Sequence, residues 1–129
     1  MAYIAKAQST RRYLDVSKRT PSIALDGASV REYLHTAEID MSVRLIRVIY
    51  EEDTSSDAGV EIRIGKIGFP AYFASFTSEI SQSAGDVTTV TKHENRNLLL
   101  AGETITVECD GGKTGAGVVG IQVEIEGYR

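Results

Sequence analysis

The 129-residue chain has one cysteine, two histidines, two prolines and no tryptophan. A single cysteine excludes an internal disulfide framework and any zinc site that needs several cysteines. No apolar run approaches the ~20 residues of a membrane-spanning helix. The first residues, MAYIAKAQSTRRYLDVSKR, contain no apolar stretch of the kind found in a secretory signal. We therefore expect a protein that is made in the cytoplasm and has no membrane partner.

The composition is that of an ordinary globular domain, with 42% hydrophobic and 25% charged residues. A chain of this length buries about two-thirds of its unfolded surface, so it folds without help from a metal or a cofactor, and we expect neither. The formal charge of −4 argues against a dedicated nucleic-acid-binding protein.

The charge is distributed unevenly along the chain. Five of the 14 basic residues and one of the 18 acidic residues lie within the first 19 positions, which leaves nine basic and 17 acidic residues for the rest. A basic segment on an acidic body is expected to lie across an acidic surface, on its own body, on a neighbouring subunit or on another protein. A solvated terminal tail is the alternative. The candidate partner-binding residues are Lys6, Arg11, Arg12, Tyr13, Lys18 and Arg19.

Alternation of apolar and polar residues predicts three half-buried strands. Residues 60–67 (VEIRIGKI) place Val60, Ile62, Ile64 and the neighbourhood of Ile67 inward, with a bulge at Gly65. Residues 104–109 place Ile105, Val107 and Cys109 on one face, and residues 119–126 alternate in the same way. All three are rich in β-branched residues, which suit a pleated surface.

Residues 42–50 (SVRLIRVIY) are also β-branched, but their apolar pattern changes phase at Leu45 and Ile46. A bulge or a strand buried on both faces explains this change, and a strand is preferred over a helix because no capping signal frames the segment. Weaker strand candidates are residues 29–34, 72–76, 87–91 and 98–100.

Short strands separated by turn signals predict an all-β fold, namely an antiparallel β-sandwich, jelly roll or Greek-key barrel, with an extended N-terminal arm. The expected division is a basic arm of residues 1–37 and a β-sandwich body of residues 38–129.

Some residues are of types that occur in catalytic or ligand-binding sites, but each of them also has a purely structural explanation. Gly112, Lys113 and Thr114 resemble part of a phosphate-binding loop, but the upstream glycine is missing and a strand follows, so we expect a hairpin loop. Cys109 lies on the apolar face of its strand, where a cysteine behaves as a small hydrophobe. His35 and His93 show no metal-ligand spacing. We therefore expect no catalytic, cofactor-binding or metal-binding residues.

The densest acidic group is Glu51, Glu52, Asp53 and Asp57. Its spacing does not match the helix-loop-helix calcium pattern, although a calcium ion is an alternative. The preferred interpretation is an exposed acidic loop, on which the basic arm of a neighbouring copy docks.

A small β-sandwich is also the scaffold of many carbohydrate-binding modules. Sugar platforms need exposed flat aromatic rings, and this chain has no tryptophan. Its aromatic cluster, in which Tyr72 and Phe73 are the candidate sugar contacts, is equally typical of a core or a subunit interface.

The last third contains an L-x-A-G-x-x-I-x-V strand entry, a Gly-Thr-Gly-rich loop and a closing Val-Glu-Ile-Glu strand, and residues 60–65 read V-x-I-x-I-G. Over residues 38–129 this pattern resembles small structural proteins of tailed-bacteriophage heads. The resemblance implies a capsid decoration (cement) protein, which binds the major capsid protein on the outside of the shell, reinforces it and is often a homotrimer. It implies a virion protein. Separately, no residue pattern in the sequence supports catalysis, so we expect no enzymatic activity. A tail, fibre or collar subunit and a carbohydrate-binding module are the alternatives.

Overall fold

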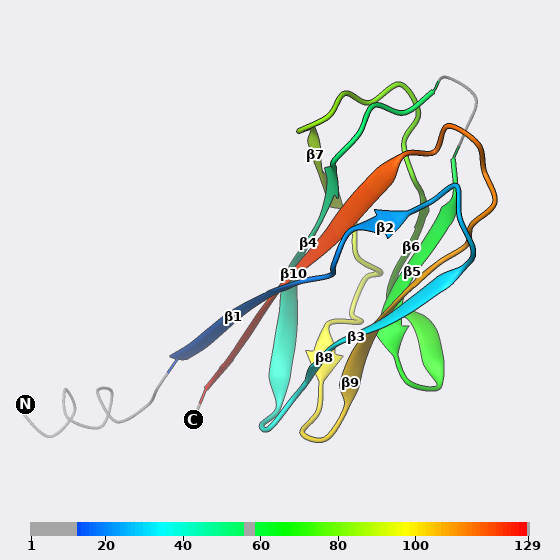
Figure 1. Cartoon of the computed structure of the whole chain (residues 1–129). Coiled ribbons are helices and arrows are strands. Elements are labelled where there is room, and N and C mark those ends of the chain that lie inside the picture. The colour runs from blue at the N-terminus through cyan, green and yellow to red at the C-terminus, as the bar shows by residue number, and fades with distance from the viewer. Residues whose placement is uncertain (1–12, 56–58, 129) are drawn as a thin grey trace, which may run out of the picture.

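The computed structural model describes residues 13–55 and 59–128, and every regular element in this part of the chain is a β-strand. The strands are β1 (Tyr13–Arg19), β2 (Ile23–Ala24), β3 (Val30–Thr36), β4 (Met41–Tyr50), β5 (Glu61–Lys66), β6 (Phe69–Thr77), β7 (Val87–Val90), β8 (Leu98–Leu99), β9 (Thr104–Cys109) and β10 (Val118–Tyr128). They form two antiparallel sheets (Figure 1). The predicted all-β sandwich is therefore confirmed. No helix in the described residues is long and apolar enough to cross a membrane.

The two sheets draw on strands from the whole described chain. One sheet has the order β1-β10-β4-β7, with β2 also paired to β10 and β8 to β4, and the other has the order β3-β9-β5-β6. The first strand pairs with the last, so that Tyr13 lies opposite Tyr128 and Arg19 lies opposite Gln122. Strands that are distant in sequence therefore pair.

The core lies between the two sheets and is made of the inward residues of the predicted alternating strands. Ile62 and Ile64 of β5, Ile105 and Val107 of β9, and Ile121, Val123 and Ile125 of β10 are fully buried. Burial of one such side chain stabilises the fold by about 1.5–3 kcal/mol. The weaker strand candidates are also observed, as β3, β6, β7 and β8.

Two bulges explain the breaks in the sequence pattern. In the β4–β10 ladder, Leu45 lies opposite Glu124 while Val43 lies opposite Ile125, so β4 has one extra residue between them. This bulge restores the inward direction of Val43 and accounts for the change of phase in the sequence. The second register shift falls between Ile64 and Lys66, at the predicted position of Gly65.

Three sequence-based expectations are wrong. Residues 13–36, which were assigned to the arm, contribute β1 and β2 to one sheet and β3 to the other, so the sandwich does not begin at residue 38. Ile67 is not inward but 64% exposed, because it lies in the turn between β5 and β6. The loop of residues 110–117 is not a hairpin, because β9 and β10 belong to different sheets.

Candidate interaction surfaces

The outer face of the six-stranded sheet carries a cluster of ion pairs. Glu124 of β10 accepts hydrogen bonds from Arg47 Nη1 at 2.8 Å and from Arg44 Nη2 at 2.6 Å. Both arginines lie on β4, which pairs with β10 through this region. The hydrogen bonds from Arg47 and then Arg44 lower the pKa of the Glu124 carboxyl. The carboxylate is therefore ionised at neutral pH and joins the two central strands of the sheet.

A basic residue of the predicted arm contacts the predicted acidic loop within one chain. Arg19 Nη2 lies 2.5 Å from Glu51 Oε1. To reach it, the arginine crosses β10 at Gly120, where an added Cβ would lie 2.7 Å from Arg19 Nε. The absence of a side chain at Gly120 is therefore what lets a β1 arginine lie flat across β10 and reach the end of β4.

The other predicted partner-binding residues are placed as follows. Lys18 is exposed on β1, and Tyr13 is the first residue of that strand. Lys6, Arg11 and Arg12 lie outside the described residues.

The predicted acidic loop follows β4. Glu52 and Asp53 are exposed, and Asp53 Oδ1 accepts a hydrogen bond from the backbone N–H of Ala84 at 2.8 Å. Asp57 lies outside the described residues. Among the described residues, no group of three or more His, Cys, Asp or Glu side chains is placed to hold a metal ion.

The outer face of the four-stranded sheet carries a second set of ion pairs. Arg31 of β3 donates to Glu108 Oε1 through Nε at 3.2 Å and Nη2 at 2.8 Å. Arg63 of β5 donates to Asp110 Oδ1 at 2.7 Å and also lies 3.3 Å from Glu61. Because Arg31, Glu108 and Arg63 are aligned across β3, β9 and β5, they form one cross-strand row.

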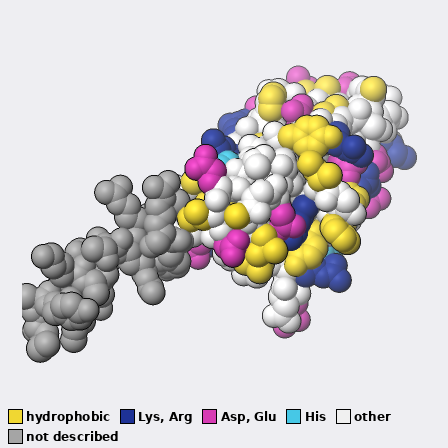
Figure 2. Space-filling model, turned by 90° about the horizontal axis from the view of Figure 1, so that it is seen from below, with side chains coloured by type: hydrophobic (Ala, Val, Ile, Leu, Met, Phe, Trp, Pro, Cys, Tyr) yellow, Lys and Arg dark blue, Asp and Glu magenta, His cyan; other side chains and the backbone are white. Residues whose placement is uncertain are grey.

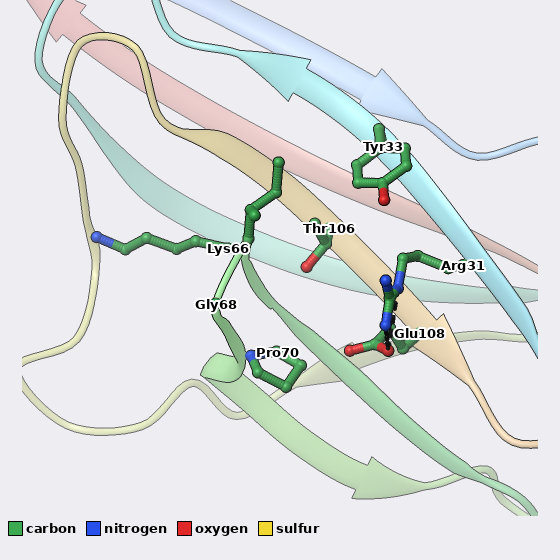
Figure 3. A pocket seen from close by; sticks show the side chains of 8 residues that line it. Arg31, Tyr33, Lys66, Gly68, Pro70, Thr106 and Glu108 are labelled. Carbon is green, nitrogen blue, oxygen red and sulfur yellow. Dashed lines mark hydrogen bonds and ion pairs between the residues drawn. The ribbon is translucent and has the colours of Figure 1, made fainter.

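A pocket of about 200 Å³ adjoins this row, next to the β5–β6 hairpin. In the next row of the sheet, Tyr33, Thr106 and Gly65 are aligned across the three strands. The pocket is bounded by Arg31, Tyr33 and Glu108 on one side and by Ile67, Gly68 and Pro70 of the hairpin on the other. Figure 3 shows the Thr106 hydroxyl directed into the space between the hairpin and Arg31.

Glycine at position 65 gives the hairpin its position over the sheet. A Cβ there would lie 2.2 Å from the Phe69 carbonyl oxygen and 2.5 Å from the Pro70 carbonyl carbon. No side chain fits in that space, so the backbone of β6 lies directly over Gly65. The hairpin backbone thereby forms one wall of the pocket.

Exposed apolar side chains surround the hairpin and the region of β8. Ile67 and Phe69 are 64% and 65% exposed, and Leu98 and Leu100 are also exposed. In the view from below, Figure 2 shows hydrophobic side chains in several places on this end of the sandwich, among charged ones. Single apolar side chains among charged ones are common on protein surfaces, so they do not define an interface by themselves.

The structure also places the cysteine, the two histidines and the glycine-rich loop that the sequence singled out. Cys109 is buried, and burial raises the pKa of its thiol to about 12. Burial and then the charge of Lys18 lower the pKa of His35, while His93 is exposed on a loop. Gly112 donates its backbone N–H to the Gly27 carbonyl at 2.7 Å, so the glycine-rich loop packs against the β2–β3 connection.

The aromatic cluster belongs mainly to the core. Phe73 is fully buried, and Tyr72 packs against it edge to face with ring centres 5.1 Å apart. Lys66 covers the Tyr72 ring. These two rings therefore do not form the flat exposed platform that sugar binding requires.

The fold and these surfaces define a two-sheet antiparallel β-sandwich whose outer faces carry cross-strand ion pairs. Two solved structures share the fold. One is titled "Cyanophage Pam1 capsid asymmetric unit", with a TM-score of 0.52, 9% identity, and coverage of 92% of this chain and 84% of that chain. The other is titled "Acidic stable capsid structure of Helicobacter pylori bacteriophage KHP30", with a TM-score of 0.56, 8% identity, and coverage of 92% and 96%. At these identities the likeness is one of fold.

Comparison with family models found no match, and no curated protein matches the sequence.

Sequence reasoning missed the pocket. Its lining comes from β3, β9 and the β5–β6 hairpin, and Tyr33 and Thr106 are 73 positions apart. A signal was present in the outward position of Thr106 between Ile105 and Val107, but the aligned Gly65 and Tyr33 become visible only with the strand register.

Proposed function

We propose that this chain is a structural protein of a bacteriophage virion, and more specifically a decoration protein that binds the outside of the capsid and reinforces the shell. The observation that carries this proposal is the likeness of fold to two phage capsid structures, which extends over 92% of the chain in both comparisons. The resemblance in strand and loop pattern supports the same class of protein. The role is one of binding, not of catalysis, in keeping with the buried Cys109.

In this proposal the major capsid protein is the partner, and the protein acts as a homo-oligomer, for which a trimer is favoured. Repeated modest contacts over a capsid add up to strong attachment, because the second and later contacts of an oligomer are effectively intramolecular. The protein is made in the cytoplasm of the host cell and is then located on the capsid surface.

The basic N-terminal residues make the first contact. Lys6, Arg11, Arg12, Lys18 and Arg19 dock on an acidic surface of the capsid or of a neighbouring subunit, with Tyr13 beside them. The Arg19–Glu51 pair, at 2.5 Å, is an intramolecular example of this contact. In the same way, the acidic residues Glu51, Glu52, Asp53 and Asp57 accept the basic segment of a neighbour.

Co-sedimentation with empty capsids tests this function. A variant that lacks residues 1–12 keeps the ten strands of the described residues, whereas removal of residues 1–37 would also delete β1, β2 and β3. We expect the full chain to co-sediment and the shortened chain to bind more weakly, with a loss of binding as salt screens the charges. The matched variant Lys6→Gln, Arg11→Gln, Arg12→Gln keeps the length and removes the charge.

Each outcome addresses a different part of the proposal. Failure of the full chain to bind capsids at any salt concentration would overturn the decoration role. Equal binding by the full chain and both variants would overturn the role of the basic segment alone. Electron microscopy of labelled virions separates the capsid from the alternative location on a tail, fibre or collar.

A further inference from the structure

The hydroxyl of Thr106 has no partner although it is buried. Thr106 is 3% exposed, and its Oγ1 makes no hydrogen bond to any described residue. A buried hydroxyl without a partner has a cost in stability, because it has lost its hydrogen bonds to water and gained none in the protein. The neighbouring outward residue of the same strand, Thr104, avoids this cost because its hydroxyl lies 2.8 Å from that of Thr36. The unpaired hydroxyl of Thr106 instead faces the pocket beside the β5–β6 hairpin (Figure 3).

The size of the pocket limits what it can hold. Its volume of about 200 Å³ is below the ~300–1,000 Å³ of typical small-molecule and cofactor sites. A single large side chain is a better match. Interfaces between proteins often place one aromatic side chain in a pocket of this kind, where it supplies much of the binding energy.

The charges of the pocket favour an uncharged occupant. Arg31 directs two donors at the same Glu108 oxygen, at 3.2 and 2.8 Å. The third charged residue of the lining, Lys66, donates to Glu103 Oε1 at 2.9 Å, so every charge at the pocket already has a counter-ion. A charged group placed in the pocket would lose water and gain no counter-ion from these paired charges. The occupant therefore needs a neutral polar atom for Thr106 and an apolar body for the other walls.

The other walls of the pocket are apolar and can contact an apolar ring. Tyr33 and Ile67 are 60% and 64% exposed at the rim, and Pro70 lines the hairpin side. A phenol ring has two apolar faces and a polar tip. Its hydroxyl can both donate to and accept from the Thr106 hydroxyl, whereas an indole N–H can only donate.

We propose that the pocket formed by Tyr33, Thr106, Ile67 and Pro70 is an anchor site for a tyrosine side chain of a partner protein. The ring lies between Tyr33 and the β5–β6 hairpin, and its hydroxyl bonds to Thr106 Oγ1. The inference rests on the proposed assembly role in one respect, that the tyrosine belongs to another protein subunit. The pocket itself is a property of this chain.

The test uses the full chain in solution and two small probes, N-acetyl-L-tyrosinamide and N-acetyl-L-phenylalaninamide. Binding is followed by NMR through the backbone amides of β9 and the methyl groups of Thr106 and Ile67. We expect shifts confined to the pocket and an affinity about three- to tenfold higher for the tyrosine probe, the value of one neutral hydrogen bond.

Two variants distinguish the hydrogen bond to Thr106 from nonspecific hydrophobic binding. Thr106→Val keeps the shape of the side chain and is expected to abolish the preference for tyrosine while binding the phenylalanine probe as before. Thr104→Val makes the same change on the same strand and face, outside the pocket, and is expected to keep the preference. Ile67→Ser, at an exposed turn position, is expected to lower the affinity of the pocket for both probes.

Several results would overturn the inference. They are no shift at the pocket with either probe, equal affinity for the two probes, retention of the tyrosine preference in Thr106→Val, or shifts at the pocket with a monosaccharide instead of the amides. Because these measurements need no capsid, their failure is distinguishable from a failure of the decoration role.

Discussion

The ammonium nitrogen of Lys66 lies 4.1 Å from the centre of the Tyr72 ring. This lysine is the last residue of β5 and is 8% exposed, which is unusual for a charged residue. The position is tolerated because Lys66 Nζ also donates to Glu103 Oε1 at 2.9 Å, and because the faces of aromatic rings attract cations. Glu103 in turn accepts the backbone N–H of Leu100 at 2.7 Å, so one charge pair connects the β5–β6 hairpin to the β8–β9 turn.

Replacement of Lys66 tests this arrangement. We expect Lys66→Ala to lower the free energy of unfolding by about 1–3 kcal/mol, because it empties a packed position and leaves Glu103 without its cation. Lys66→Met is expected to cost less, since the thioether still packs on Tyr72. Urea denaturation measures both. Lys113→Ala, at an exposed loop position, is the control and is expected to stay within about 0.5 kcal/mol of the parent. Equal stability of Lys66→Ala and the parent would contradict this account.

The stability of the protein should decrease in acid. Hydrogen bonds from Lys66, Arg63 and Arg47 lower the pKa values of Glu103, Asp110 and Glu124 below their ordinary values of 4.5, 3.8 and 4.5. Between the folded and unfolded pKa values, the unfolded chain binds more protons, so this stabilisation is complete above about pH 4.5 and is lost as the pH falls through the folded values. This loss of stability can be tested by measuring the free energy of unfolding from pH 7 to pH 2.5.

Glu124→Gln isolates the largest of these clusters, because it removes one titrating group and its charge pairs with Arg44 and Arg47. The acid dependence of this variant should be shallower than that of the parent. Glu94→Gln, at an exposed loop glutamate, should leave the dependence unchanged. Identical pH profiles for the parent and Glu124→Gln would show that the arginine contacts do not contribute to stability.

The sequence predicts clearly the strands that bury a full apolar row. It predicts the edge strands β3, β6 and β7 only weakly and the edge strand β1 not at all. β5, β9 and β10 show period-two alternation because one of their faces enters the core. In β1, by contrast, Val16 is half-buried between exposed Asp15 and Ser17, and the strand lies at the sheet edge, so its composition is that of a solvated segment. This is why the predicted arm extended too far.

The pairing of the strands could not be predicted from the sequence either. Alternation shows which residues face inward, but it does not assign a strand to one sheet or the other, so the glycine-rich loop between β9 and β10 was interpreted as a hairpin. The Arg19–Glu51 contact depends on Gly120 lying between them in the folded sheet. The opposite charges of the two segments were visible in the sequence, whereas the intramolecular contact was one of several open alternatives.

Gly65 should not tolerate a side chain. The Cβ of Gly65→Ala would lie 2.2 Å from the Phe69 carbonyl oxygen, so β6 would have to move away from the sheet. We expect a loss of more than about 2 kcal/mol in the free energy of unfolding. Gly27→Ala is the matched control, because its nearest contact, the Ala24 carbonyl oxygen at 3.5 Å, is an ordinary one. If the two alanine variants unfold at the same urea concentration, the close approach of the hairpin is not as described.

Cys109 should react with thiol reagents only when the protein unfolds. Its side chain is buried beside Ile62 of the neighbouring strand β5, and burial raises the thiol pKa to about 12. At pH 8 only about one thiol in 10⁴ would then be ionised, and the thiolate is the reactive form. We expect 5,5′-dithiobis(2-nitrobenzoate) to label the native protein at the rate of its unfolding, and to label the protein in urea at once. The Cys109→Ala variant, which should not be labelled in either state, gives the background. Rapid stoichiometric labelling in native buffer would contradict the burial of Cys109.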